Sequence, residues 1–118
     1  MRIALLASIA VAIAGCTFGT ISVPSPPDGI YRGLFEKRFE VSSFRPCGSS
    51  ERWWVTGLVE PLITAVTSSR GLVGGIAYVE LRGRVSSRGR YGHLGGYPRE
   101  FIVESVLLAR APRDIDCP

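Results

Sequence analysis

Alternation of apolar and polar residues predicts strands over much of the chain. Residues 76–85 give the clearest pattern, because Ala77, Val79 and Leu81 share one face of the expected strand and indicate a buried side. Residues 100–110 also alternate, with apolar side chains on both faces, as in a strand covered on two sides. Earlier, period-two patterns predict strands over residues 31–36, 38–42 and 52–56, with a break after Phe44. Residues 37–38 either separate the first two strands or bend one long strand.

Residues 58–68 change to helical spacing. Leu58, Leu62 and Val66 would share one helix face, and Pro61 suits a first helical turn. Glycines 71, 74 and 75 would then end the helix. The predicted order is therefore three strands, one helix and two strands.

This element order, over residues 30–110, resembles the OB-fold, a five-stranded partly open barrel. The resemblance implies a mainly β domain with one helix between strands three and four. Gly33 and Gly83 would allow the sharp bends that barrel strands need. The alternative is an open antiparallel sheet with one packed helix.

The N-terminus has the layout of a secretory signal: Arg2, an apolar run over residues 3–13, and then Ala14, Gly15 and Cys16. The run is shorter than the roughly 20 apolar residues that cross a membrane as a helix. Ile13-Ala14-Gly15-Cys16 resembles the bacterial lipobox, which implies cleavage before Cys16 and a diacylglyceryl group on its thiol. The alternative is an ordinary signal peptide that ends in a chance cysteine.

These patterns divide the chain into three parts. Residues 1–15 are the expected signal peptide, residues 16–29 a lipidated cysteine with a proline-rich tether, and residues 30–118 one small β domain. The lipid anchor makes a membrane the first partner. The residue after the cysteine is Thr17 rather than aspartate. In this the chain resembles lipoproteins of the outer membrane, so if the source has two membranes, the domain is expected on the outer one, facing the periplasm.

Charge sets few limits on the partner. The whole chain carries a net charge of +4, and removal of residues 1–15 takes away one arginine and leaves +3. Such a small charge does not by itself imply a polyanion. Nucleic acid is disfavoured by the expected compartment outside the cytoplasm.

Cys47 and Cys117 are the two cysteines that remain after Cys16. In an exported chain such a pair is expected to form a disulfide. The alternatives are two free thiols or a thiolate metal site. A closed zinc site normally needs four Cys or His ligands, and with His93 this chain would offer three, so no metal is predicted.

No catalytic arrangement is apparent, and no cofactor is predicted. His93 is the single histidine, and no carboxylate is placed beside it by the sequence. Glu80, Glu100 and Glu104 are expected on solvated strand faces or in pairs with arginines. The chain is therefore predicted not to be an enzyme.

Residues 82–99 combine five arginines with three aromatic or imidazole rings. Arginine forks bind phosphate or carboxylate groups, and tyrosine rings stack on sugars. This stretch would form the loop between strands four and five, and its candidate ligand-binding residues are Arg88, Arg90, Tyr91, His93 and Tyr97. The alternative is a solvated hairpin that binds nothing.

Trp53 and Trp54 are adjacent, so their rings should point to opposite sides of a strand. One ring is expected in the core. The other would be exposed as a ligand surface or, as the simpler interpretation, packed under the helix of residues 58–68.

These observations predict an envelope lipoprotein whose domain is a non-catalytic binding or structural module, with an anionic envelope component as candidate ligand and no protein partner identified. A small lipidated β-barrel also resembles, in architecture alone, the NlpE-type lipoproteins of copper homeostasis and envelope stress. This chain lacks their Cys-x-x-Cys motif, and the mature part has no methionine. A small envelope hydrolase is the third alternative.

Overall fold

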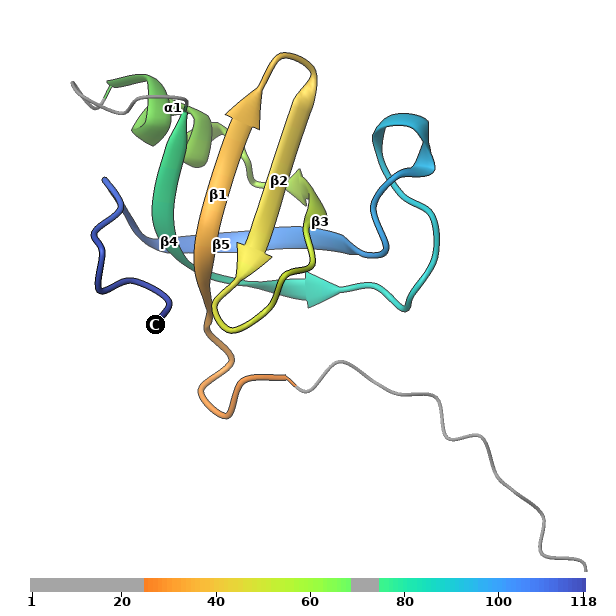
Figure 1. Cartoon of the computed structure of the whole chain (residues 1–118), viewed down its shortest axis with the longest axis horizontal. Helices are drawn as coiled ribbons and strands as arrows, with labels where there is room; N and C mark the ends of the chain where they lie inside the picture. The colour runs from red at the N-terminus through yellow and green to blue at the C-terminus, as the bar shows by residue number, and fades with distance from the viewer. Residues whose placement is uncertain (1–24, 69–74) are drawn as a thin grey trace, which may run out of the picture.

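The computed structural model describes residues 25–68 and 75–118. The predicted signal peptide, Cys16 and the first part of the tether lie outside these residues, as do Gly71 and Gly74. Figure 1 shows the order of elements. They are β1 (Tyr31–Arg38), β2 (Val41–Pro46), β3 (Trp53–Gly57), α1 (Glu60–Ser68), β4 (Ile76–Val85), the short 3₁₀ turn His93–Gly95, and β5 (Glu100–Arg110).

The five strands form one sheet that closes on itself in the order β1-β2-β3-β5-β4, with β4 paired back to β1. The β3–β5 pair is parallel, and the other pairs are antiparallel. The ring is not a regular barrel, because β2 and β3 are joined only through Ser43↔Trp54 and Phe44↔Trp53. The prediction of a mainly β, OB-like domain with one helix between strands three and four is confirmed, and its alternative of a sheet with one packed helix is consistent with the same elements.

Aromatic side chains fill the inside of the ring. Phe35, Phe44 and Phe101 are completely buried, and the rings of Phe44 and Phe101 lie 5.1 Å apart. Tyr31 and Trp53 complete the cluster. Full burial of one such side chain stabilises the fold by about 1.5–3 kcal/mol, so this cluster contributes several kcal/mol to the stability of the ring.

Helix α1 covers one end of the ring through Leu62 and Val66, which are both buried. It begins at Glu60 rather than residue 58. The prediction that Leu58 lies on the buried helix face was wrong, because its N–H donates to the Val103 carbonyl at 2.9 Å and continues the strand pairing of β3. Pro61 lies in the first turn, where its missing N–H leaves no helix hydrogen bond unmade.

Two strand glycines permit close approach of neighbouring backbone. A Cβ atom on Gly33 would lie 2.2 Å from the Arg45 carbonyl oxygen, and one on Gly83 would lie 2.3 Å from that of Ile102. Gly83 also lies at a register shift between β4 and β5. The strand break expected after Phe44 comes later than predicted, since Arg45 still pairs with Leu34 and Pro46 ends β2.

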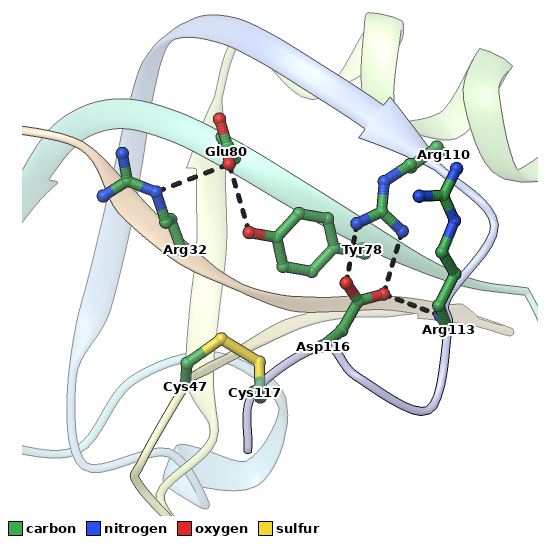
Figure 2. The surroundings of a disulfide bond; sticks show 8 residues. All are labelled: Arg32, Cys47, Tyr78, Glu80, Arg110, Arg113, Asp116 and Cys117. Carbon is green, nitrogen blue, oxygen red and sulfur yellow. Dashed lines mark hydrogen bonds and ion pairs between the residues drawn. A yellow bond between two sulfur atoms is a disulfide. The ribbon is translucent and has the colours of Figure 1, made fainter.

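The C-terminal tail is fastened to the ring at two points (Figure 2). Cys47 and Cys117 form the predicted disulfide across 70 residues. Arg110 donates two hydrogen bonds to the carboxylate of Asp116, at 2.6 and 2.9 Å, and the Arg113 N–H donates to the same carboxylate. The Arg110 guanidinium lies 4.3 Å from the centroid of the Tyr78 ring, so the tail and β4 are held together.

Candidate functional site

The loop over residues 86–99 is a small hairpin in its own right. Tyr91 and Tyr97 exchange backbone hydrogen bonds of 2.9 and 3.2 Å, and Gly89 donates to Pro98 at 2.8 Å. The Tyr91 hydroxyl donates to the Ser87 carbonyl at 3.0 Å. These bonds explain how a glycine-rich stretch adopts a defined shape, with the 3₁₀ turn at its tip.

Arg99 fastens the base of this loop. Only 6% of Arg99 is exposed, and its Nη1 donates to the Ser86 carbonyl at 3.1 Å. Its Nε makes no hydrogen bond and lies 3.8 Å from the carboxylate of Glu51. The predicted arginine-rich loop therefore uses one arginine to hold its own ends together.

Glu51 binds a second arginine of the loop. Its carboxylate accepts a hydrogen bond of 3.1 Å from the Trp53 indole and forms an ion pair with Arg88. The bond from Trp53, and then the one from Arg88, lower the pKa of Glu51 below its ordinary value of 4.5. Arg88 thus has a partner within the chain, 37 residues away in sequence.

The five predicted ligand-binding residues divide into two groups. Tyr91 and Tyr97 are partly buried and shape the loop, and Arg88 is paired with Glu51. Arg90 and His93 are exposed, and among the described residues neither side chain has a hydrogen bond or ion pair. The structure therefore leaves two of the five freely presented to solvent.

Trp54 joins this loop to the sheet. Its ring lies 5.3 Å from that of Tyr97, and a Cβ atom on Gly92 would lie 2.2 Å from the indole. Trp53 is buried in the core, as one of the two tryptophans was expected to be. The interpretation that the other ring packs under the helix was wrong, because the loop after β4 covers it instead.

A row of residues crosses the outer face of the ring at the level of Trp54. Glu36 of β1 pairs with Ser43 of β2, Ser43 pairs with Trp54 of β3, and Trp54 pairs with Glu100 of β5. Alternation places these side chains opposite the core residues Phe35, Phe44 and Trp53.

Beside this row lies a shallow pocket of about 80 Å³. Its apolar walls come from β1 and β4, and its polar rim comes from β1, β2 and the approach to β3. The lining residues are Leu34, Glu36, Ser43, Arg45, Arg52 and Ile76.

Glu36 organises the charges around the pocket. It is 8% exposed, and its carboxylate forms ion pairs with Arg38 and, at 3.3 Å, with Arg52. Arg45 lies on the same rim and is exposed, and no ion pair within the described residues involves it. Three positive charges against one negative charge leave this group at +2.

Sequence reasoning did not find this pocket. The alternation in residues 31–38 does place Leu34 and Glu36 on the face opposite Phe35. The pocket forms only when the strand register brings Glu36, Ser43 and Arg52 together. This register depends on three strands at once, so the pattern in one segment could not predict it.

The carboxylates considered for acid–base chemistry each have a separate partner. Glu104 pairs with Arg84 at 2.9 Å, and Glu100 accepts a hydrogen bond of 2.7 Å from Thr56. Glu80 pairs with Arg32 at 3.4 Å and accepts a bond from the Tyr78 hydroxyl. Among residues 25–68 and 75–118, no group of three or more His, Cys, Asp or Glu side chains is arranged to hold a metal ion.

No protein-family model, curated protein or solved structure matches the chain. Within the part of the chain that the structure describes, no helix has both the length and the apolar character to cross a membrane.

Proposed function

We propose that the chain is a lipid-anchored envelope lipoprotein whose OB-like domain binds an anionic envelope component without catalysing a reaction. The anchor rests on Ile13-Ala14-Gly15-Cys16 after an apolar run. Two or more acyl chains on one cysteine hold a protein stably on a membrane, whereas one chain binds marginally. Thr17 favours the outer membrane, facing the periplasm, where the source has two membranes.

The binding face is the outer side of β1, β2 and β3, bordered by the loop of residues 86–99. The observation that carries this assignment is the arrangement of Arg38, Arg45 and Arg52 around the pocket that contains Glu36. A guanidinium has five N–H donors, so an arginine held by Glu36 keeps further donors for a ligand. Carboxylate and phosphate groups match these donors in geometry and charge.

The loop makes a secondary contribution. Among the described residues, the exposed side chains of Arg90 and His93 have no hydrogen-bond or ion-pair partner, so they are available to a ligand. Arg88 would have to break its ion pair with Glu51 to reach a ligand. We therefore place the proposed ligand site on the sheet beside the loop, whereas the sequence predicted a site in the loop alone. The loop forms the border of the site.

The anchor is tested by Cys16→Ser in cells fed a clickable fatty acid. The wild-type protein is expected to incorporate the label and fractionate with membranes, and the variant to lose the label. A labelled Cys16→Ser protein would contradict lipidation at this cysteine.

The binding is tested with the mature protein in phosphatidylcholine nanodiscs. One arm adds trigalacturonic acid, and another replaces part of the lipid with phosphatidylglycerol; amide hydrogen exchange of residues 33–54 reports contact. Arg45→Gln with Arg52→Gln is expected to weaken binding by at least about ten-fold, since about 1.4 kcal/mol corresponds to that factor. Arg82→Gln with Arg113→Gln, two exposed arginines on β4 and in the C-terminal tail, is the control that removes the same charge. Absence of contact in both arms would contradict the proposed function.

A further inference from the structure

The outer face of β1–β3 places an aromatic ring beside a cationic pocket. Ser43 is the neighbour of both Glu36 and Trp54 in adjacent strands. Because adjacent strands are about 4.8 Å apart, the distance from the Glu36 position to the Trp54 position is roughly 10 Å. This is about the length of a disaccharide lying across the strands.

The Trp54 ring is held in place by contacts with the loop of residues 86–99. Tyr97 packs against its ring and Gly92 lies directly on the indole, while the residue as a whole remains partly exposed. An aromatic ring that is held in place and still reaches solvent is suited to stacking on the apolar face of a sugar, because little side-chain entropy is lost on binding.

The pocket itself accepts a small group. Its volume of about 80 Å³ leaves room for one charged substituent to enter from the open side. Leu34 and Ile76 provide apolar walls, while Arg45 and Arg52 supply donors at the rim. A carboxylate or phosphate carried on a sugar ring would find both kinds of contact.

The point at which the chain enters β1 favours a polymer over the membrane that holds the anchor. Residues 25–30 enter β1 at one end, and the β1–β2 hairpin lies at the opposite end (Figure 1). Glu36 and Ser43 belong to the half of the β1–β2 pair that is nearer the hairpin. An anchored domain can therefore present this face away from the lipid headgroups.

We propose that the ligand of this face is an anionic oligosaccharide, which stacks a sugar on Trp54 and places a carboxylate or phosphate substituent in the pocket between Arg45 and Arg52. This inference rests on the proposed function and assigns its ligand class. Glu36 acts as a positioning residue that orients Arg38 and Arg52.

The test is calorimetric titration of the mature protein in phosphatidylcholine nanodiscs with four probes: trigalacturonic acid, the disaccharide trehalose 6-phosphate, neutral maltotriose and inorganic phosphate. The two anionic sugars are expected to bind at least ten-fold more tightly than maltotriose or phosphate, and their ratio shows which acid is preferred. Trp54→Leu is expected to weaken both anionic sugars about ten-fold and to leave phosphate unchanged. Arg45→Gln is expected to weaken all the anions, and Arg82→Gln none of them.

Variants are compared only where their thermal midpoints show that they fold. Arg45 has no ion-pair partner within the described residues, so Arg45→Gln keeps the test available should Trp54→Leu unfold the loop. Equal binding of maltotriose and trigalacturonic acid, or a Trp54→Leu variant that folds and keeps full affinity, would overturn the inference. Contact with phosphatidylglycerol nanodiscs but with no sugar would also overturn it, while the proposed function would stand.

Discussion

The rings of Trp54 and Tyr97 lie 5.3 Å apart and connect the loop of residues 86–99 to the outer face of β3. The contact is possible because Gly92 has no side chain at the point where the loop passes over the indole. Gly92 has φ 68° and ψ −155°, a conformation that is essentially restricted to glycine. The loop therefore depends on backbone freedom at one residue.

Gly92→Ala is expected to detach the loop from Trp54. The new Cβ would lie 2.2 Å from the indole and would also occupy a disfavoured backbone conformation, at a cost of at least about 1–3 kcal/mol for the closed loop. Near-ultraviolet circular dichroism and amide exchange of residues 86–99 measure the effect.

Gly96→Ala is the matched control in the same loop. Gly96 has φ −82°, and its added Cβ would meet the His93 carbonyl at an ordinary 3.5 Å, so little change is expected. Equal exchange rates in the two variants would show that the Gly92 contact does not hold the loop.

Replacing both Cys47 and Cys117 with alanine is expected to lower the free energy of unfolding by about 2–4 kcal/mol, because the disulfide closes a long loop in the unfolded chain. Chemical denaturation measures the loss. Reductant should lower the midpoint of the wild-type protein and leave that of the double variant unchanged. A wild-type midpoint that is insensitive to reductant would show that the bridge contributes no stability.

Acid is expected to weaken the fold through Asp116 and Glu51. The hydrogen bonds from Arg110, and then that from the Arg113 N–H, lower the pKa of Asp116 below its ordinary value of 3.8 (Figure 2). The hydrogen bonds from Trp53 and then from Arg88 lower the pKa of Glu51 below its ordinary value of 4.5. A carboxylate whose folded pKa is depressed contributes stability above its unfolded pKa, and this contribution is lost as pH falls through the folded pKa.

Unfolding free energy measured from pH 7 down to pH 2 should therefore be nearly constant above pH of about 5 and should fall below about pH 4.5. Asp116→Asn removes one carboxylate with a depressed pKa, so the variant should be less stable at pH 7 and should depend less on pH in the acid range. An acid slope identical to that of the wild-type protein would exclude Asp116 as a source of the effect.

Local pattern was sufficient to predict the order of the strands and the helix, whereas contacts between strands required the structure. The strands at residues 76–85 and 100–110 were predicted at their observed bounds because alternation over ten residues has only one compatible geometry. The Cys47–Cys117 pair followed from the expected compartment and the number of cysteines. These predictions needed no knowledge of register.

The candidate site was only partly predictable for the opposite reason. Arg88 was expected to face a ligand, but Glu51 in the approach to β3 binds it. The Glu36 pocket draws its lining from four separate segments, and a shift of one residue in any strand would turn its side chains to the other face.

Leu94 combines an exposed apolar side chain with a left-handed backbone conformation, and neither of these stabilises the fold. It is 89% exposed at the tip of the loop, and its φ of 56° lies in the left-handed region, which costs a residue with a Cβ atom roughly 1–2 kcal/mol. Asparagine tolerates this conformation better. Leu94→Asn is therefore expected to raise the unfolding free energy by up to about 1 kcal/mol, measured by chemical denaturation.

Leu107→Asn provides the comparison, because Leu107 is also partly exposed but lies in β5, where asparagine is disfavoured. That variant should be destabilised. If Leu94→Asn were destabilised to the same extent, the backbone conformation at Leu94 would not be strained. A stabilised Leu94→Asn protein would show instead that the exposed leucine at the loop tip is not needed for folding, so its contribution could then be measured directly in the oligosaccharide titrations.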